Sequence, residues 1–306
     1  MPRSLRCLVP AAAALGLSAC GLEPDVLLPP RAPGHPVAYV SQGLARNDDI
    51  FLLSADASSD VNLTSNAMYD SWPAWSPDGA KLAFESNRDD PRQTEVYVLT
   101  LADRTVARLT DDTGHADAQP AWSPLGNRLA FVSGRDSAGF DIYLMNTNGT
   151  SVTRLTTDSA NSAQPAWSPD GTRIAFATDR NGPLGIGEIY AMDTTGGNQV
   201  NLTNSLANDL TPSWSPDGLH IAFMSNRDSA TFAIWIMDAS GANPRRVSPL
   251  IRECGVPSWT PDGVRLAFEC DADIWVVNAD GSGLSQITRT TNQQRGEAIP
   301  RWKPVP

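Results

Sequence analysis

The fold is decided by residues 73–84, PAWSPDGAKLAF, because close copies of this stretch recur along the chain. Its Trp75 has equivalents spaced 43 to 47 residues apart. A repeat of this length indicates an array of like-built units, such as a propeller or a solenoid. The other copies begin at Pro120, Pro165, Pro212 and Pro257, and a truncated one, PRWKPVP, covers residues 300–306.

Each part of the repeat predicts a β-structure. In Ser-Pro-Asp-Gly, proline presets φ, aspartate bonds its own backbone and glycine accepts a positive φ, so the tetrapeptide predicts a tight hairpin turn. The Leu-Ala-Phe run that follows is typical of a strand buried on both faces. Aromatic and β-branched runs such as residues 95–99 (EVYVL) and 141–145 (DIYLM) indicate the next strand. Four short strands per unit are the pattern of a propeller blade.

The register of the repeats predicts how the ring closes. The apolar run that predicts the second strand of a unit occurs six times, starting with VAYV at residues 37–40. The chain, in contrast, ends in a predicted first strand at Trp302. We therefore predict an all-β protein, a single six-bladed propeller over residues 37–306 with four-stranded antiparallel blades. The strand of Trp302 should pair with residues 37–41, which removes the exposed sheet edges.

The first residues predict export. Arg3 and Arg6 precede the apolar residues 8–17, and the following Leu-Ser-Ala-Cys ends at Cys20 and resembles a bacterial lipobox. This resemblance implies a signal peptide over residues 1–19, lipidation of Cys20 and a Pro-rich tether over residues 20–36. The alternative is an ordinary secretory signal with an incidental Cys20. We expect a lipid-anchored protein of the outer membrane facing the periplasm, or of the cell surface.

The repeat P-x-W-SPDG-x-x-[LI]-A-F, with its later [DE]-I-Y-x-M and closing [RN]-L-T, resembles the TolB-type propeller repeat, a relative of the WD-type repeat. The resemblance implies a periplasmic or cell-surface binding propeller. We expect a lipoprotein variant that lacks the N-terminal α/β domain of TolB.

Composition excludes several functions. The formal net charge is −11, whereas nucleic-acid binding requires a basic surface. There is no G-x-S-x-G elbow, P-loop or dinucleotide fingerprint, so we expect no enzymatic activity. Of the three histidines, His35 and His220 should be solvated, and His115 should lie in a loop near the channel mouth.

The longer loops should share one face of the ring, and two charged features are expected there. The first is an inner ring of positions five residues before each Trp: Asp70, Asp117, Ser162, Asp209, Cys254 and Glu297. The second is an arginine that follows the second strand in four blades: Arg88, Arg135, Arg180 and Arg227.

These charges allow two interpretations. The arginines could hold the acids in place through bidentate hydrogen bonds, which is an architectural role. Alternatively, acids and arginines could form an open mouth that grips a basic segment of a partner or a cation. We predict no cofactor and no dedicated metal site. The alternative is Ca²⁺ in the channel, since such a ring could supply several oxygen ligands.

Cys254 and Cys270 are expected to form a disulfide. They lie at equal distances in sequence from Asp262 of the hairpin turn, so they should face each other across the first two strands of their blade. An oxidising compartment favours the bond, with a Cα–Cα separation of about 4.4–6.8 Å.

Three functions fit these features. We favour a membrane-tethered, non-enzymatic, monomeric module that binds a protein or peptidoglycan-associated partner through the loop face around the channel. The alternatives are a divalent-cation-assisted hydrolase or lyase that uses the acidic mouth, and a scaffold that contacts partners through its blade sides. Fold alone does not choose among them.

Overall fold

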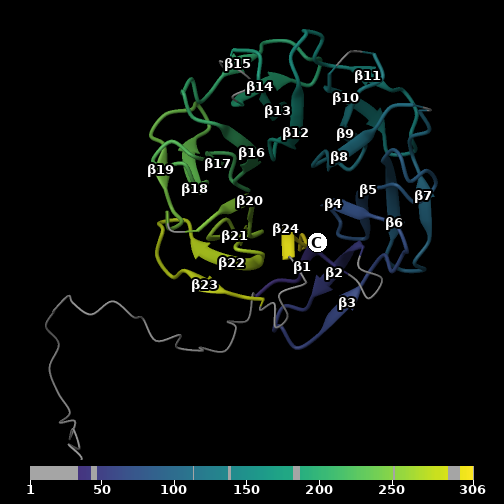
Figure 1. Cartoon of the computed structure of the whole chain (residues 1–306), viewed down its shortest axis with the longest axis horizontal. Coiled ribbons are helices and arrows are strands. Elements are labelled where there is room, and N and C mark those ends of the chain that lie inside the picture. Colours follow the sequence, from purple (N-terminus) through teal and green to yellow (C-terminus); the bar gives the residue numbers. More distant parts are fainter. Residues whose placement is uncertain are drawn as a thin grey trace, which may run out of the picture.

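The computed structural model describes residues 34–42, 47–112, 114–136, 139–181, 187–250, 252–288 and 297–305. The predicted signal peptide, Cys20 and all but the last residues of the tether lie outside these ranges. Within them the chain forms six four-stranded antiparallel sheets, arranged in a ring (Figure 1). The prediction of a six-bladed all-β propeller is therefore confirmed.

The four strands of each blade lie side by side in order from the channel outward. The innermost strands are β4 (Asp70–Trp75), β8 (Asp117–Trp122), β12 (Ser162–Trp167), β16 (Asp209–Trp214), β20 (Cys254–Trp259) and β24 (Glu297–Trp302). The second strands are β5 (Lys81–Ser86), β9 (Arg128–Ser133), β13 (Arg173–Thr178), β17 (His220–Ser225), β21 (Arg265–Cys270) and β1 (Val37–Gln42). The third strands are β6 (Glu95–Thr100), β10 (Asp141–Asn146), β14 (Glu188–Asp193), β18 (Ala233–Asp238), β22 (Asp273–Asn278) and β2 (Asp48–Leu53).

The outermost strands are short, which limits the exposed sheet edge that each blade presents. They are β7 (Val106–Arg108), β11 (Thr153–Arg154), β15 (Val200–Asn201), β19 (Arg245–Arg246), β23 (Ser285–Gln286) and β3 (Asp60–Asn62).

The ring closes as predicted. The last strand, β24, pairs antiparallel with the first, β1, so that Trp302 lies opposite Val37 and Ala298 opposite Val40. One blade therefore has the strand order β24-β1-β2-β3 and contains both ends of the described chain. The pairing completes this blade from the two ends of the described chain and leaves β1 without a free edge.

The core lies between neighbouring blades. The second-strand run is buried on both of its faces, as predicted: Leu82, Ala83 and Phe84 have no solvent exposure. Phe84 packs in one apolar cluster with Val40 and Ile50 of the preceding blade. Burying such side chains contributes about 1.5–3 kcal/mol each, so the repeated run is the main source of cohesion between blades.

Each innermost strand contains a β-bulge that the sequence analysis did not predict. In five blades its pairing with the second strand shifts by one residue, for example between Ser71 and Ala74, and in the sixth the shift lies between Ala38 and Val40 of β1. In every innermost strand the residue before the proline adopts a positive φ, which side chains with a Cβ rarely do. These residues are Trp72, Gln119, Gln164, Thr211, Val256 and Ile299, with φ between 49° and 57°.

The bulges turn backbone N–H groups away from their own blade. The N–H of Gln119 donates to Oε2 of Glu85 at 2.9 Å, and the N–H of Gln164 donates to Oε1 of Gln119 at 2.8 Å. The N–H of Thr211 then donates to Oε1 of Gln164 at 2.8 Å. Four neighbouring blades are thus linked around the channel by hydrogen bonds from the N–H group of one bulge to a side chain of the preceding blade.

The repeated tryptophans also join the blades. The indole N–H of Trp167 donates to the carbonyl oxygen of Ala121 at 3.1 Å, and that of Trp75 donates to the carbonyl oxygen of Arg301 at 3.1 Å. Trp259 and Trp302 make the equivalent bonds to Ser213 and Ser258. The spacing of the Trp residues in the sequence therefore reflects contacts between blades.

Candidate functional site

The predicted acid–arginine pairs form on the loop face. Nη2 of Arg88 donates to Oδ1 of Asp70 at 2.8 Å, while its Nε donates to Oγ of Ser86 at 3.1 Å. The same arrangement joins Arg135 to Asp117 at 2.5 Å. It also joins Arg227 to both carboxylate oxygens of Asp209, at 3.1 and 3.0 Å.

The arginines also stack on aromatic side chains. The guanidinium of Arg88 lies 4.9 Å from the ring centroids of both Phe84 and Tyr97. Arg227 lies 5.0 Å from Phe223 and 4.9 Å from Trp235. Cation–π contacts at such distances contribute about 0.5–2 kcal/mol each, so the arginines fasten the loop to the blade core.

Burial favours the architectural one of the two interpretations of this ring. Asp70, Asp117 and Asp209 have no solvent exposure, because their arginines and aromatic neighbours cover them. Burial raises the pKa of Asp70 and of Asp209, and the hydrogen bonds from serine and arginine oppose this rise. The geometry therefore supports the architectural interpretation, in which these carboxylates do not meet a partner.

Two blades vary the arrangement. Where Ser162 replaces the acid, Arg180 pairs instead with Asp158 at 3.1 Å and still stacks on Phe176 and Tyr190. In the disulfide blade, Arg252 reaches from the preceding loop to lie 5.1 Å from the Trp275 ring. The side chain of Glu297 lies outside the described residues.

The predicted disulfide is present. Cys254 and Cys270 are paired across β20 and β21, with an S–S distance of 2.00 Å. Their Cα atoms are 4.2 Å apart, slightly less than the range expected. The equivalent positions in another blade, Ser162 and Thr178, share a hydrogen bond of 3.2 Å, so the disulfide occupies a position that is polar elsewhere.

The histidines differ partly from expectation. His35 is less solvated than expected: its side chain is only 24 % exposed, and its ring meets that of Trp302 edge-on, with centroids 6.2 Å apart. His220 is partly exposed beside Asp238, and His115 is exposed in a loop beside Asp112. None of the three lines the channel cavity described next.

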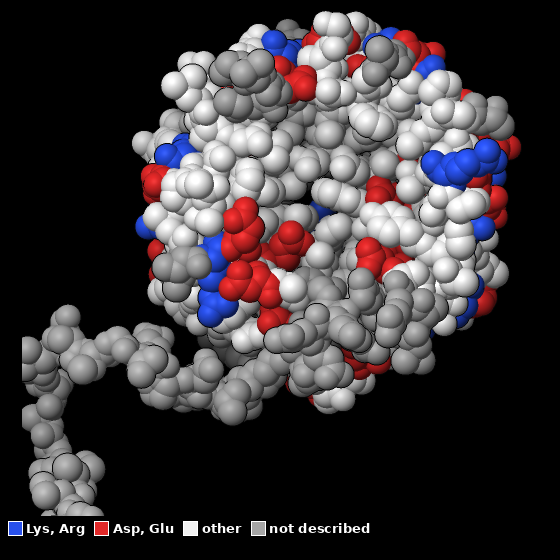
Figure 2. Space-filling model, in the orientation of Figure 1, with Lys and Arg blue, Asp and Glu red and all other residues white. Residues whose placement is uncertain are grey.

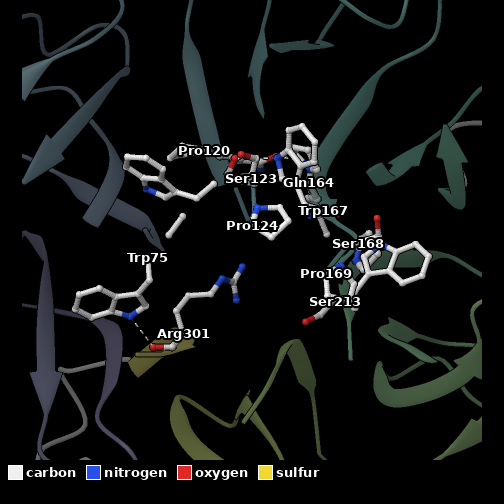
Figure 3. A pocket seen from close by; sticks show the side chains of 18 of the residues that line it. Trp75, Pro120, Ser123, Pro124, Gln164, Trp167, Ser168, Pro169, Ser213 and Arg301 are labelled. Atoms are coloured by element: carbon white, nitrogen blue, oxygen red, sulfur yellow. Dashed lines mark hydrogen bonds between the residues drawn. The ribbon is translucent and has the colours of Figure 1, made fainter. Parts of the chain in front are cut away.

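A cavity of about 430 Å³ opens in the channel at the end where the hairpin turns lie, opposite the loop face on which a site was expected (Figure 3). Its wall consists of residues from the innermost strands and the turns that follow them. Prolines such as Pro120, Pro124 and Pro169 and tryptophans such as Trp75 and Trp167 make most of this wall apolar. A volume of this size is typical of a site for a small ligand or a short peptide segment.

Arg301 is the single charged residue among the described residues that line the cavity. Figure 3 shows its side chain extending from β24 into the cavity, and its Nη1 donates to the carbonyl oxygen of Pro300 at 3.0 Å. Burial lowers the pKa of Arg301 to about 10, and the negative charge of Glu269 opposes this shift. The guanidinium therefore stays protonated at neutral pH.

Acids lie toward the other end of the channel. Glu85 accepts hydrogen bonds from the Gln119 N–H and, at 2.9 Å, from the hydroxyl of Tyr69, and burial raises its pKa to about 7. Burial also raises the pKa of Glu269, whose Oε2 accepts the N–H of Ile299 at 3.2 Å. Figure 2 shows acidic side chains on opposite sides of the central opening, with a small basic patch inside it. The channel is thus electrically asymmetric along its axis.

The described part of the chain has no group of three or more His, Cys, Asp or Glu side chains placed to hold a metal ion. It also has no helix long and apolar enough to cross a membrane.

Sequence reasoning missed the cavity and Arg301, although a signal was present. The residue before each repeated Trp is Ala or Ser in five copies and Arg in the last. Small residues at this position in five of the six innermost strands leave room on the channel axis, and the long side chain of the sixth must lie in that room.

Comparisons with known proteins agree with this architecture. A family model described as the TolB beta propeller domain matches residues 90–186 and 165–295. TolB from Acinetobacter baumannii is similar in structure, with a TM-score of 0.75 and 22% identity over 90% of this chain and 68% of that chain. The putative TolB from Agrobacterium tumefaciens has a TM-score of 0.69 and 20% identity, over 89% of this chain and 99% of that chain.

The structure of a lyase is also similar. An oligogalacturonate lyase in complex with manganese has a TM-score of 0.56 and 16% identity, over 85% of this chain and 75% of that chain. No curated protein matches the sequence. At these identities the structural likenesses show the fold alone.

Proposed function

Because the chain belongs to the TolB β-propeller domain family, we propose that it is a non-enzymatic binding module of the cell envelope. It is exported, tethered through lipidated Cys20, and takes a segment of a protein or cell-wall ligand into the channel cavity. The observation that carries this proposal is the cavity itself, an apolar hollow with one cation at the axis of the ring.

The cavity is a better candidate than the acid–arginine ring on the loop face. The carboxylates of that ring are fully buried beneath arginines that already have partners. The cavity, in contrast, offers apolar walls and a guanidinium that forms no ion pair among the described residues. Concave apolar surfaces with a few polar groups are the usual form of a binding site.

The proposal is tested by filling the cavity. Ser213 lines it, so Ser213→Trp should occupy the space. Leu219→Trp, in the exposed turn of the same hairpin, adds an equal side chain outside it. The immobilised chain should capture the same envelope component as wild type with Leu219→Trp and lose it with Ser213→Trp. Capture that survives Ser213→Trp in a folded protein would contradict a cavity site.

The tether is tested separately. Cys20→Ser should move the protein from the membrane fraction to the soluble fraction and abolish its labelling by a radioactive fatty acid. Membrane association that persists without Cys20 would contradict lipid anchoring.

The alternative of a cation-assisted hydrolase or lyase has its own test. Titration calorimetry with Mn²⁺ or Ca²⁺ on the full chain would detect a resident cation. Tight binding that is abolished by Glu269→Gln or Glu85→Gln, which change two acids of the channel, would favour this second function over a binding module.

A further inference from the structure

One position of the repeat has a small residue in five copies and a large charged residue in the sixth, and this position lies at the cavity. Arg301 occupies the residue before Trp302, and five other copies have a small residue there: Ala74, Ala121, Ala166, Ser213 and Ser258. Four of these small residues line the cavity together with Arg301. The small side chains leave the space, and the sixth blade fills part of it with a cation.

The guanidinium of Arg301 lacks a carboxylate partner. Among the described residues it forms no ion pair, and its interactions are the bond from Nη1 to the oxygen of Pro300 and a contact of 6.0 Å with the Trp72 ring. Glu269 influences Arg301 by longer-range electrostatic attraction and forms no ion pair with it. A cation held in an apolar wall without a paired anion is costly, so an anion that enters the cavity relieves this cost.

Two amides add further donors to the cavity wall. Oε1 of Gln119 accepts the N–H of Gln164, and Oε1 of Gln164 accepts the N–H of Thr211. These bonds define the orientation of both side-chain amides, since an N–H must face an oxygen. Their NH₂ groups therefore remain as donors, and both residues line the cavity.

We propose that the cavity binds a carboxylate group, with Arg301 as its ion-pair partner and the amides of Gln119 and Gln164 as donors to neighbouring carbonyl oxygens. This inference rests on the proposed function, because it assigns a ligand class to the same site. Guanidinium and carboxylate match in geometry and form paired, charge-assisted hydrogen bonds.

The carboxylate that fits best is that of a peptide terminus. A chain end can enter a cavity closed by the ring of blades, and its last small apolar side chains suit walls of proline and tryptophan. The channel acids Glu85 and Glu269 disfavour passage of an anion farther along the axis. Such a terminus can come from a partner protein or from a cell-wall stem peptide, and both present the same chemistry.

The experiment compares probes that differ in the charge of the terminus. N-acetyl-trialanine, its C-terminal amide and N-acetyl-lysyl-D-alanyl-D-alanine are titrated into the full chain by calorimetry, with tryptophan fluorescence as a second readout. The variant Arg301→Ala introduces the small residue that the other blades have at this position, so it should fold. Arg301→Lys keeps the positive charge but lacks the paired hydrogen-bond donors of a guanidinium. Ser258→Ala, an exchange at the same repeat position, is the matched control.

The expected result is a preference for the free acid over the amide of roughly tenfold or more in wild type and in Ser258→Ala. Arg301→Ala should abolish this preference, and Arg301→Lys should retain part of it. Glu269→Gln should tighten binding of the acid, because it removes a competing negative charge. Tighter binding of the D-alanyl probe than of N-acetyl-trialanine assigns the terminus to the cell wall, and the reverse assigns it to a protein.

Equal binding of acid and amide to wild type, or no binding of either acid, would overturn the inference. A preference that survives Arg301→Ala would overturn it as well. If capture from envelope extract is nevertheless lost with Ser213→Trp, the proposed function stands and only its carboxylate ligand is wrong. If capture also survives Ser213→Trp, the cavity is not the binding site.

Discussion

Nη2 of Arg227 lies 3.0 Å from Oδ2 of Asp209, and the carboxylate of this ion pair is completely buried. Removal of the arginine would leave a buried charge without its ion-pair partner. We expect Arg227→Ala to lower the free energy of unfolding by about 3–5 kcal/mol, as measured by urea denaturation.

The blade of Arg180 offers a matched control, because Ser162 stands where Asp209 stands in the Arg227 blade. Arg180→Ala removes a similar stack on two aromatic rings but leaves no buried acid without its ion-pair partner. It should therefore lower the free energy of unfolding by only about 1–2 kcal/mol. The double variant Asp209→Ser with Arg227→Ala should recover part of the loss. Equal costs for the two single arginine variants would contradict the burial argument.

Glu85 makes the stability of the protein depend on pH. Burial raises its pKa in the folded state from the usual 4.5 to about 7. Folding therefore favours the protonated acid, and this contribution is complete below pH 4.5 and is lost as the pH rises through 7. Between pH 4.5 and 8, the free energy of unfolding of wild type should fall by roughly 3 kcal/mol relative to Glu85→Gln. Parallel pH profiles for the two proteins in urea would show that Glu85 does not titrate in this way.

The disulfide should stabilise the propeller by restricting the unfolded chain. The paired cysteines are 16 residues apart in sequence, which corresponds to about 3 kcal/mol in the chain-entropy description. The variant Cys254→Ser with Cys270→Thr reproduces the hydrogen-bonded pair Ser162 and Thr178 of another blade, so it should fold with this loss. Thermal unfolding of the variant and of oxidised and reduced wild type provides the measurement. A reduced wild type as stable as the oxidised protein would contradict the prediction.

The indole of Trp167 donates a hydrogen bond between blades, whereas Nε1 of Trp122 has no hydrogen-bond partner among the described residues. Trp167→Phe should therefore cost about 1 kcal/mol more than Trp122→Phe, since both remove a similar apolar area and only the first removes a bond. Chemical denaturation of the two variants side by side measures this difference. A cost for Trp122→Phe as large as that for Trp167→Phe would assign the effect to packing.

Local patterns in the sequence were enough to predict the blades. Turn residues, apolar runs and aromatic strands recur with a common spacing, and each has a local physical cause that acts within a few residues. The offset between the first and last copies predicted the pairing of β24 with β1, and the symmetry about Asp262 predicted that Cys254 faces Cys270. Charge at repeated positions likewise indicated which arginines meet which acids.

The sequence alone determined the ring, its closure and its disulfide, because these follow from strand periodicity and equal spacing. Only the tertiary structure decided which end of the channel is hollow and what lies in it. Burial of Asp70 depends on Arg88 folding over it, and the positive φ of Gln119 depends on an acceptor supplied by the neighbouring blade. Arg301 faces the small residues of other blades only because a closed ring brings six distant positions to one axis.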